Sequence, residues 1–193
     1  MNFNLTHLVQ STKRSLLRLA DQLNDVEVVV FQEFSLKSEQ FRNMLDFDSH
    51  ILIRQNPNPL IYVITITDSF EKQYLIERFA NFSKENKLKA KSKDRLNHSR
   101  YNDKNVPESL VLYVGSSLNG FKNRLKDHLG VKKGLRTYGL HLSKWDNGLD
   151  YSIQVKSYEV RSKLPVERHL VELLEQQIWD ELQPAFGKRS GLL

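Results

Sequence analysis

The stretch that most constrains the fold is residues 110–129, which reads LVLYVGSSLNGFKNRLKDHL. Its first five residues are apolar and Gly115 follows them, and a short aliphatic run bounded by turn residues is typical of a buried strand. The dipeptide Asn119-Gly120 then marks a turn, and the residues after it follow a helical pattern. Residues 110–129 therefore predict a strand, a turn and a helix in succession.

Three polar side chains of this unit form a candidate site. Arg124 and His128 are four residues apart, so they project from one face of the predicted helix, one turn apart. Tyr113 lies on the strand that precedes them. A guanidinium, an imidazole and a phenol in this arrangement can bind a phosphate and move a proton. The unit is therefore a candidate site for chemistry at a phosphate group.

The composition bounds the partners of this site. The chain of 193 residues has 29 Lys and Arg against 23 Asp and Glu, and its net charge of +6 favours a nucleic acid or an anionic membrane. No apolar run approaches the length of about 20 residues that spans a bilayer. The first residues lack the order of a signal peptide, and the absence of cysteine excludes disulfides and thiolate zinc sites. We expect a cytoplasmic protein with no membrane partner and no small-molecule cofactor.

The remaining patterns predict a mixed α+β fold, a small and mainly antiparallel three-stranded sheet flanked by helices. Asn56-Pro57-Asn58-Pro59 marks a boundary between an N-terminal extension, residues 1–57, and a core, residues 58–193. The extension is expected to hold an amphipathic helix over 5–23 packed on the domain, a strand over 26–31 and a short helix over 37–47.

Within the core, an insertion over about 69–107 separates the first two strands. The strands are expected at 60–66, 110–114 and 151–160, and further helices at 69–87, at 137–145 and from Pro165 to Leu182. The second part of the insertion, residues 84–104, is polar and basic and is expected to be an exposed loop.

The segment Tyr113-Val114-Gly115, with Arg124 and His128 in register after it, resembles the catalytic core of the GIY-YIG nuclease family. Tyr113-Val114-Gly115 stands as the second half of the family's name motif. The strand at 60–66 resembles the first half through Tyr62, although Leu60 stands where the name glycine would be. The resemblance covers about residues 58–187 and is interrupted by the insertion.

Two positions of the family pattern have alternatives in this sequence. Tyr62 is far from Tyr113 in the chain, and Tyr101 lies at a more usual distance but outside a predicted strand. Glu175, nine residues before Pro184, resembles the metal-binding glutamate of the family, and Glu172 is the other candidate. Where the family often has an asparagine after this proline, the chain has Gly187.

The resemblance implies a divalent-metal-dependent endonuclease that hydrolyses DNA, with Mg²⁺ or Mn²⁺ held by Glu175, and the expected partner is double-stranded DNA. It implies that Tyr62 is the general base, that Tyr113 positions it and that Arg124 holds the scissile phosphate; His128 either orients the tyrosine or is itself a base. The expected DNA contacts are the basic residues Lys87, Lys89, Lys91, Lys93, Arg95, Arg100, Lys132 and Lys133. The alternative is a catalytically inactive nucleic-acid-binding protein on the same scaffold.

Overall fold

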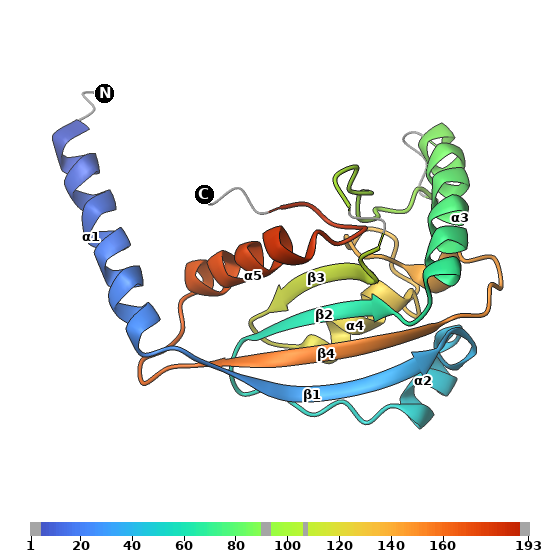
Figure 1. Ribbon diagram of the computed structural model, residues 1–193, viewed down its shortest axis with the longest axis horizontal. Helices are drawn as coiled ribbons and strands as arrows, with labels where there is room; N and C mark the ends of the chain where they lie inside the picture. The colour runs from blue at the N-terminus through green and yellow to red at the C-terminus, as the bar shows by residue number, and fades with distance from the viewer. Residues whose placement is uncertain (1–4, 90–93, 106–107, 190–193) are drawn as a thin grey trace.

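The computed structural model describes residues 5–89, 94–105 and 108–189, which form an α+β fold around one four-stranded antiparallel sheet (Figure 1). The strands are β1 (Glu27–Lys37), β2 (Leu60–Ile66), β3 (Val111–Ser117) and β4 (Ser152–Arg161), in the order β1-β4-β2-β3. The helices are α1 (Leu5–Asn24), α2 (Met44–His50), α3 (Ser69–Leu88), α4 (Phe121–Leu129) and α5 (Arg168–Leu182). Short 3₁₀ turns lie at Ser38–Phe41 and Leu142–Lys144.

The predicted fold class is confirmed, but the predicted count of three strands is wrong. The fourth strand, β1, comes from the N-terminal extension and pairs with β4 from Glu27 opposite Arg161 to Lys37 opposite Ser152. Without β1, the long strand β4 would present an open edge on that side. The sequence pattern predicts that β1 is a strand but carries no local signal of which strand it pairs with. In the structure, the N-terminal extension contributes this strand to the core sheet.

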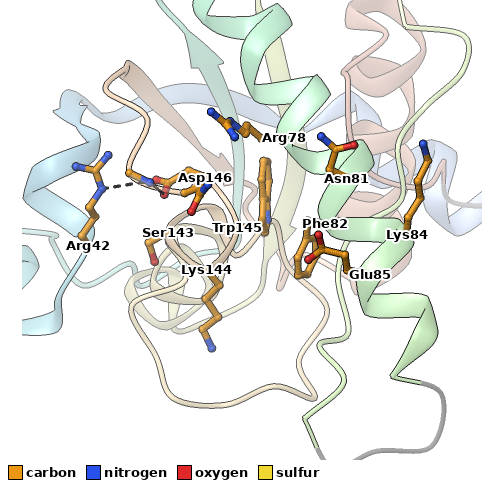
Figure 2. Close-up of a pocket in the computed structure, with 12 residues that line it drawn as sticks. Arg42, Arg78, Asn81, Phe82, Lys84, Glu85, Ser143, Lys144, Trp145 and Asp146 are labelled. Carbon is orange, nitrogen blue, oxygen red and sulfur yellow. Dashed lines mark hydrogen bonds and ion pairs between the residues drawn. The ribbon is translucent and has the colours of Figure 1, made fainter.

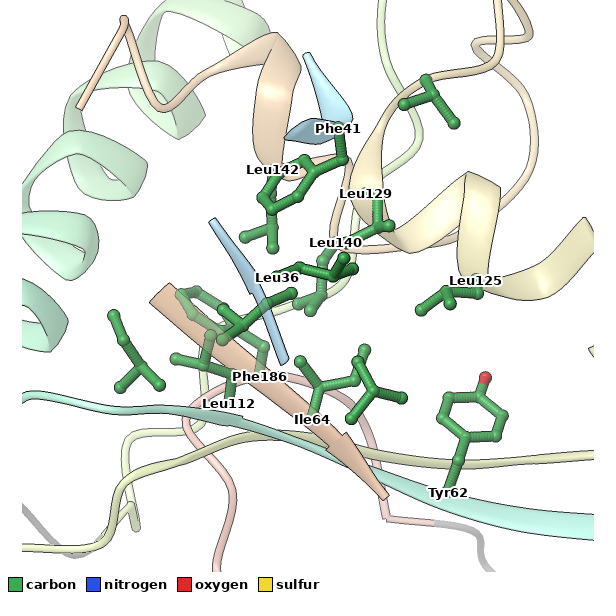
Figure 3. Close-up of a cluster of buried hydrophobic side chains, with 14 of the residues drawn as sticks. Leu36, Phe41, Tyr62, Ile64, Leu112, Leu125, Leu129, Leu140, Leu142 and Phe186 are labelled. Carbon is green, nitrogen blue, oxygen red and sulfur yellow. The ribbon is translucent and has the colours of Figure 1, made fainter. Parts of the chain in front are cut away.

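The sheet is covered by helices on both faces. Along β2, Ile61 and Val63 pack toward α5, in clusters with Val171 and Trp179. The alternate residues of β2 pack on the other face in a large cluster with side chains of α2, α3 and α4 (Figure 3). This burial on both faces explains why β2 reads as an almost continuous apolar run rather than as an alternation.

Helix α1 forms as predicted but does not pack on the domain. It projects away from the sheet (Figure 1), and its apolar residues are exposed, Leu5 by 71% and Val9 by 65%. Its contact with the rest of the chain lies toward its C-terminal end, where Arg18 pairs with Glu167 at 2.9 Å. An amphipathic pattern predicts an apolar stripe and does not specify what covers it. Among the described helices, none has the length and apolar character needed to cross a membrane.

The basic tract at 84–104 is only in part the exposed loop that the sequence predicts: residues 84–88 belong to α3, whereas the described residues 94–104 are irregular and mostly exposed. Helix α3 continues to Leu88, and the described residues 94–105 are held on the domain. The side-chain amide of Asn86 donates to the carbonyl of Leu96 at 2.8 Å and accepts from its N–H at 3.0 Å, and both residues are buried. A polar side chain thus anchors this segment on the domain. The low apolar content of the segment gives no sign of this anchoring.

Three predicted helices have different bounds in the structure. The helix predicted over 37–47 is a 3₁₀ turn followed by α2, which starts at Met44 after an Asn43 cap. The helix predicted over 137–145 is a single 3₁₀ turn, because His141 has a left-handed conformation (φ 54°). Helix α5 begins at Arg168, three residues after Pro165.

Candidate functional site

Tyr62 and His128 form a buried hydrogen bond between β2 and α4. The hydroxyl of Tyr62 points from the sheet toward the helix that carries Leu125 (Figure 3), and its oxygen lies 2.9 Å from Nε2 of His128. The backbone N–H of Leu140 donates to Nδ1 of His128 at 3.2 Å. Since Nδ1 accepts, a neutral His128 carries its proton on Nε2, and it therefore donates that proton to the oxygen of Tyr62.

The surroundings keep His128 neutral. Burial lowers the pKa of His128 well below its ordinary value, and the nearby Arg124 and His141 lower it further. A neutral imidazole with its proton directed at Tyr62 is a hydrogen-bond donor to the phenol. Of the two roles that the family resemblance leaves open for His128, this geometry favours orienting the tyrosine.

Arg124 reaches the same point from α4. Its Nη1 donates to the carbonyl oxygen of Tyr138 at 3.0 Å, and its Nη2 lies 3.4 Å from Nε2 of His128. Helix α4 is bounded by two glycines in the left-handed region, Gly120 (φ 71°) and Gly130 (φ 81°), which fix where it starts and ends. The guanidinium is half-buried and is held facing the phenols.

Tyr113 stacks on Tyr62 across the β2–β3 pair. The ring centroids are 6.3 Å apart at an interplanar angle of 22°. Gly115 lies opposite Tyr62 in the ladder, and a Cβ atom there would come within 2.6 Å of Cε1 of Tyr113 and 2.7 Å of the Tyr62 oxygen. Only glycine leaves room for both rings, so the glycine of the motif has a packing role at the site.

Glu175 approaches from the other face of the sheet. Ser116 projects to the α5 face, and its hydroxyl donates to Oε2 of Glu175 at 2.5 Å. Burial raises the pKa of Glu175, while the Ser116 hydrogen bond and the Arg124 charge oppose the shift. Burial raises the pKa of Tyr62 and of Tyr113, and the charge of Glu175 raises both further.

The structure therefore brings Tyr62 of β2 and Tyr113 of β3 together with Arg124 and His128 of α4, and Glu175 of α5 interacts with them electrostatically from the other face of the sheet. These side chains surround β3, which is an edge strand of the sheet. Four approach from the α4 face and one from the α5 face. The members of this cluster, called here the β3-edge cluster, are Tyr62, Tyr113, Arg124, His128 and Glu175.

The oxygen atoms beside Glu175 fit a hard divalent cation. The carboxylate and the Ser116 hydroxyl are the oxygen ligands that Mg²⁺ accepts, and Mg²⁺ needs only one or two protein carboxylates when waters and phosphate oxygens complete its shell. Glu172 is one helical turn away, but its carboxylate accepts from Arg168 at 2.6 Å. In the described part of the chain, no three His, Asp or Glu side chains cluster as metal ligands. The fit is thus to a cation with one protein anchor.

Tyr101 and Gly187, the other positions considered in the motif, lie beside the cluster. Tyr62 stacks on Tyr113, whereas Tyr101 packs on Phe186 with centroids 5.9 Å apart. Gly187 has φ 123°, and a Cβ atom there would lie 3.4 Å from the Tyr113 ring. The position that resembles the family's asparagine is therefore filled by backbone packed against a tyrosine.

A hollow of about 230 Å³ opens next to the cluster. Arg124 and Ser116 line it from the site side, and Arg168 lines it from α5. Glu172 also lines the hollow and pairs with Arg168 at 2.6 Å, so Arg124 is the guanidinium there that is suited to bind a phosphate. Sequence reasoning missed Ser116 and Arg168. Ser116 follows directly after Gly115, so its place on the face opposite the tyrosines could have been read from strand alternation.

The predicted DNA-binding residues fall into three groups. Lys87, Arg95 and Arg100 line one groove of about 510 Å³ together with Tyr101 and Tyr138. Lys89 and Lys133 are exposed, and Lys132 pairs with Asp127 at 3.2 Å. Lys91 and Lys93 lie outside the described residues.

A larger cavity, of about 700 Å³, lies away from these residues. It opens between α3 and residues 143–148 (Figure 2), with Phe82 and Trp145 on its wall and an ion pair of 3.9 Å between Arg42 and Asp146 at one side. No member of the β3-edge cluster lines it. Its size alone therefore does not make it the candidate site.

No family model matches the chain, and no curated protein or solved structure matches it. The function is therefore inferred from the geometry and the chemistry of the residues.

Proposed function

We propose that the chain is a divalent-metal-dependent endonuclease that hydrolyses DNA phosphodiester bonds, in restriction, defence or repair, and that it works in the cytoplasm. The observation that carries the proposal is the meeting of a guanidinium, a carboxylate and a hydrogen-bonded tyrosine–histidine pair at one edge of the sheet. These groups come from four elements of the chain, β2, β3, α4 and α5, and their types match the resemblance to the GIY-YIG nuclease family.

Arg124 is proposed to bind the scissile phosphate. It lines the hollow beside the cluster, and its planar fork can donate two hydrogen bonds to phosphate oxygens. Its contact with the Tyr138 carbonyl fixes the guanidinium before substrate arrives. A preorganised cation of this kind stabilises the charge that develops on a phosphate during hydrolysis.

Tyr62 is proposed as the general base. Once ionised, it accepts a proton from the attacking water, whose oxygen bonds to phosphorus while the bond from phosphorus to the leaving sugar oxygen breaks; the leaving oxygen takes up a proton from solvent. Ionising an ordinary tyrosine at pH 7 costs about 4 kcal/mol. Burial raises the pKa of Tyr62 and so adds to this cost, whereas Arg124 and the Nε2–H of His128 reduce it by stabilising the phenolate.

Glu175 is proposed to hold Mg²⁺ or Mn²⁺, with the Ser116 hydroxyl fixing one of its oxygens. The bound cation would neutralise charge on the scissile phosphate and polarise the attacking water. Because burial raises the pKa of Glu175, a cation beside it would also relieve the cost of keeping the carboxylate ionised.

The second candidate function is a nucleic-acid-binding protein without activity. One observation favours it: the Tyr62 side chain has no exposed surface, and its pKa is raised by that burial. A base must contact the water that it activates. In the nuclease proposal, substrate and metal therefore have to bring that water to the Tyr62 oxygen.

The test is relaxation of supercoiled plasmid by the purified chain, with Mg²⁺ and with an excess of EDTA. The nuclease proposal expects nicked or linear DNA with Mg²⁺ and intact plasmid with EDTA, at rates proportional to protein concentration. Tight DNA binding by gel shift with no cleavage in Mg²⁺ or Mn²⁺ would favour the second candidate instead.

A further inference from the structure

The groove that contains Lys87, Arg95 and Arg100 is strongly cationic. The three side chains are exposed along it, and none of them forms an ion pair within the described part of the chain. No acidic residue is among the described residues that line the groove. Cations without acidic partners, gathered on one concave surface, are the electrostatic pattern of a nucleic-acid backbone track.

Two tyrosines, Tyr101 and Tyr138, line the same groove. The side chain of Tyr138 is 66% exposed and that of Tyr101 is 38% exposed. Tyr101 is held edge-on against Phe186, so its orientation is fixed by the core. Exposed aromatic rings interleaved with cations are the arrangement on which the bases of a single strand stack.

The groove is connected to the β3-edge cluster through two contacts. Arg124 donates to the carbonyl of Tyr138, so its guanidinium is bonded to one wall of the groove. The N–H of Gly187, which packs on Tyr113, donates to the carbonyl of Arg100 at 2.8 Å. A strand lying in the groove would thus pass beside Arg124, which lines the hollow of about 230 Å³.

We propose that this groove binds unpaired nucleotides of the substrate, with Lys87, Arg95 and Arg100 on the phosphates and with Tyr101 and Tyr138 stacked on bases. The inference rests on the proposed function for the nature of the substrate and extends it to single-stranded or splayed DNA. The bases of a duplex are stacked on their own neighbours and are closed to the two rings. The groove therefore distinguishes a single strand from a duplex of the same sequence.

The experiment measures binding in EDTA, where the proposed metal-dependent cleavage does not occur. A labelled oligonucleotide with one 2-aminopurine is titrated with the chain, alone and annealed to its complement. The expected result is tighter binding of the single strand and a change in 2-aminopurine fluorescence on binding. Tyr138→Leu is expected to weaken single-strand binding by roughly 5- to 150-fold, the range for loss of one stacked base, with little effect on the duplex.

A matched control variant guards against a change in folding. Tyr74→Leu removes a tyrosine that is 58% exposed on α3 and lies outside the groove, and it is expected to have no effect. A loss with Tyr74→Leu equal to that with Tyr138→Leu would overturn the proposal, because stacking would then not be specific to the groove.

The outcomes separate this inference from the proposed function. Single-strand binding that depends on Tyr138, with no cleavage of any DNA in Mg²⁺, supports the groove and overturns the nuclease. Cleavage in Mg²⁺ with equal affinity for single strand and duplex, or with full single-strand affinity in Tyr138→Leu, overturns the groove and leaves the nuclease standing.

Discussion

The Nε2 atom of His128 lies 2.9 Å from the phenolic oxygen of Tyr62, and 66 positions separate the two residues in the chain. The Leu140 N–H on the other side of the ring fixes which nitrogen of His128 carries the proton. The imidazole thus accepts from the Leu140 N–H through Nδ1 and donates to the Tyr62 oxygen through Nε2. The bond joins the helix that carries Arg124 to the central strand β2, so its geometry sets both the stability and the chemistry of the site.

The first prediction concerns stability against pH. Burial lowers the pKa of His128 in the folded chain below its value of about 6.5 when unfolded, so below about pH 6.5 only the unfolded chain takes up this proton. Stability is therefore lost as the pH falls. Urea unfolding between pH 5 and 7 should show a steeper fall for the unchanged chain than for His128→Gln, by at most about 1.4 kcal/mol per pH unit. Equal slopes would contradict a neutral, buried His128.

The second prediction concerns the rate against pH. Because burial raises the pKa of Tyr62, the fraction of phenolate grows about tenfold per pH unit, and the logarithm of the cleavage rate should keep rising above pH 8. A base with the pKa of histidine would instead give a plateau near neutrality. Single-turnover rates from pH 6 to 9.5 distinguish the two, and Tyr62→Phe should reduce the rate by about 100-fold or more at each pH.

The third prediction concerns Arg124. Removing a preorganised donor to the developing charge typically costs about 100- to 1,000-fold in rate, so Arg124→Ala should cut slowly while it still folds and binds DNA. The matched control is Arg54→Ala, which removes the same charge from an exposed position outside the cluster. Similar cleavage rates for the two variants would remove Arg124 from the proposed site.

The fourth prediction concerns Gly115. A methyl group there would lie within 3 Å of both Tyr62 and Tyr113, so Gly115→Ala must displace the rings, at a cost of about 1–3 kcal/mol in stability. Gly134→Ala is the control, since no atom lies within 4 Å of a Cβ at that position. Thermal unfolding measures the difference, and equal melting temperatures would mean that the site has more room than the geometry indicates.

Strand β2 and the start of helix α4 could be predicted because each is determined by residues that are close together in the chain. Strand β2 has the predicted bounds, Leu60–Ile66, because it is buried on both faces and its apolar run ends where that burial ends. Helix α4 starts after Asn119-Gly120 as predicted, because a turn with positive φ at Gly120 is a local property. The convergence of Tyr62 with Tyr113 was expected only through the resemblance to a family.

The parts that could not be predicted depend on long-range contacts. The pairing of β1 with β4 and the exposure of α1 are each decided by residues far away in the chain. The same holds for Glu175. Its position on α5 is readable from the sequence, whereas its hydrogen bond to Ser116 across the face of the sheet is not.

The most direct test of the proposed site is the single-turnover rate of DNA cleavage in Mg²⁺ for the unchanged chain and for Glu175→Gln. The amide keeps the size of the side chain and can still accept from Ser116, but it removes the charge that would hold the cation. The proposed site predicts cleavage by the unchanged chain and a rate about 100-fold lower, or lower still, for Glu175→Gln. Equal rates for the two proteins would contradict it.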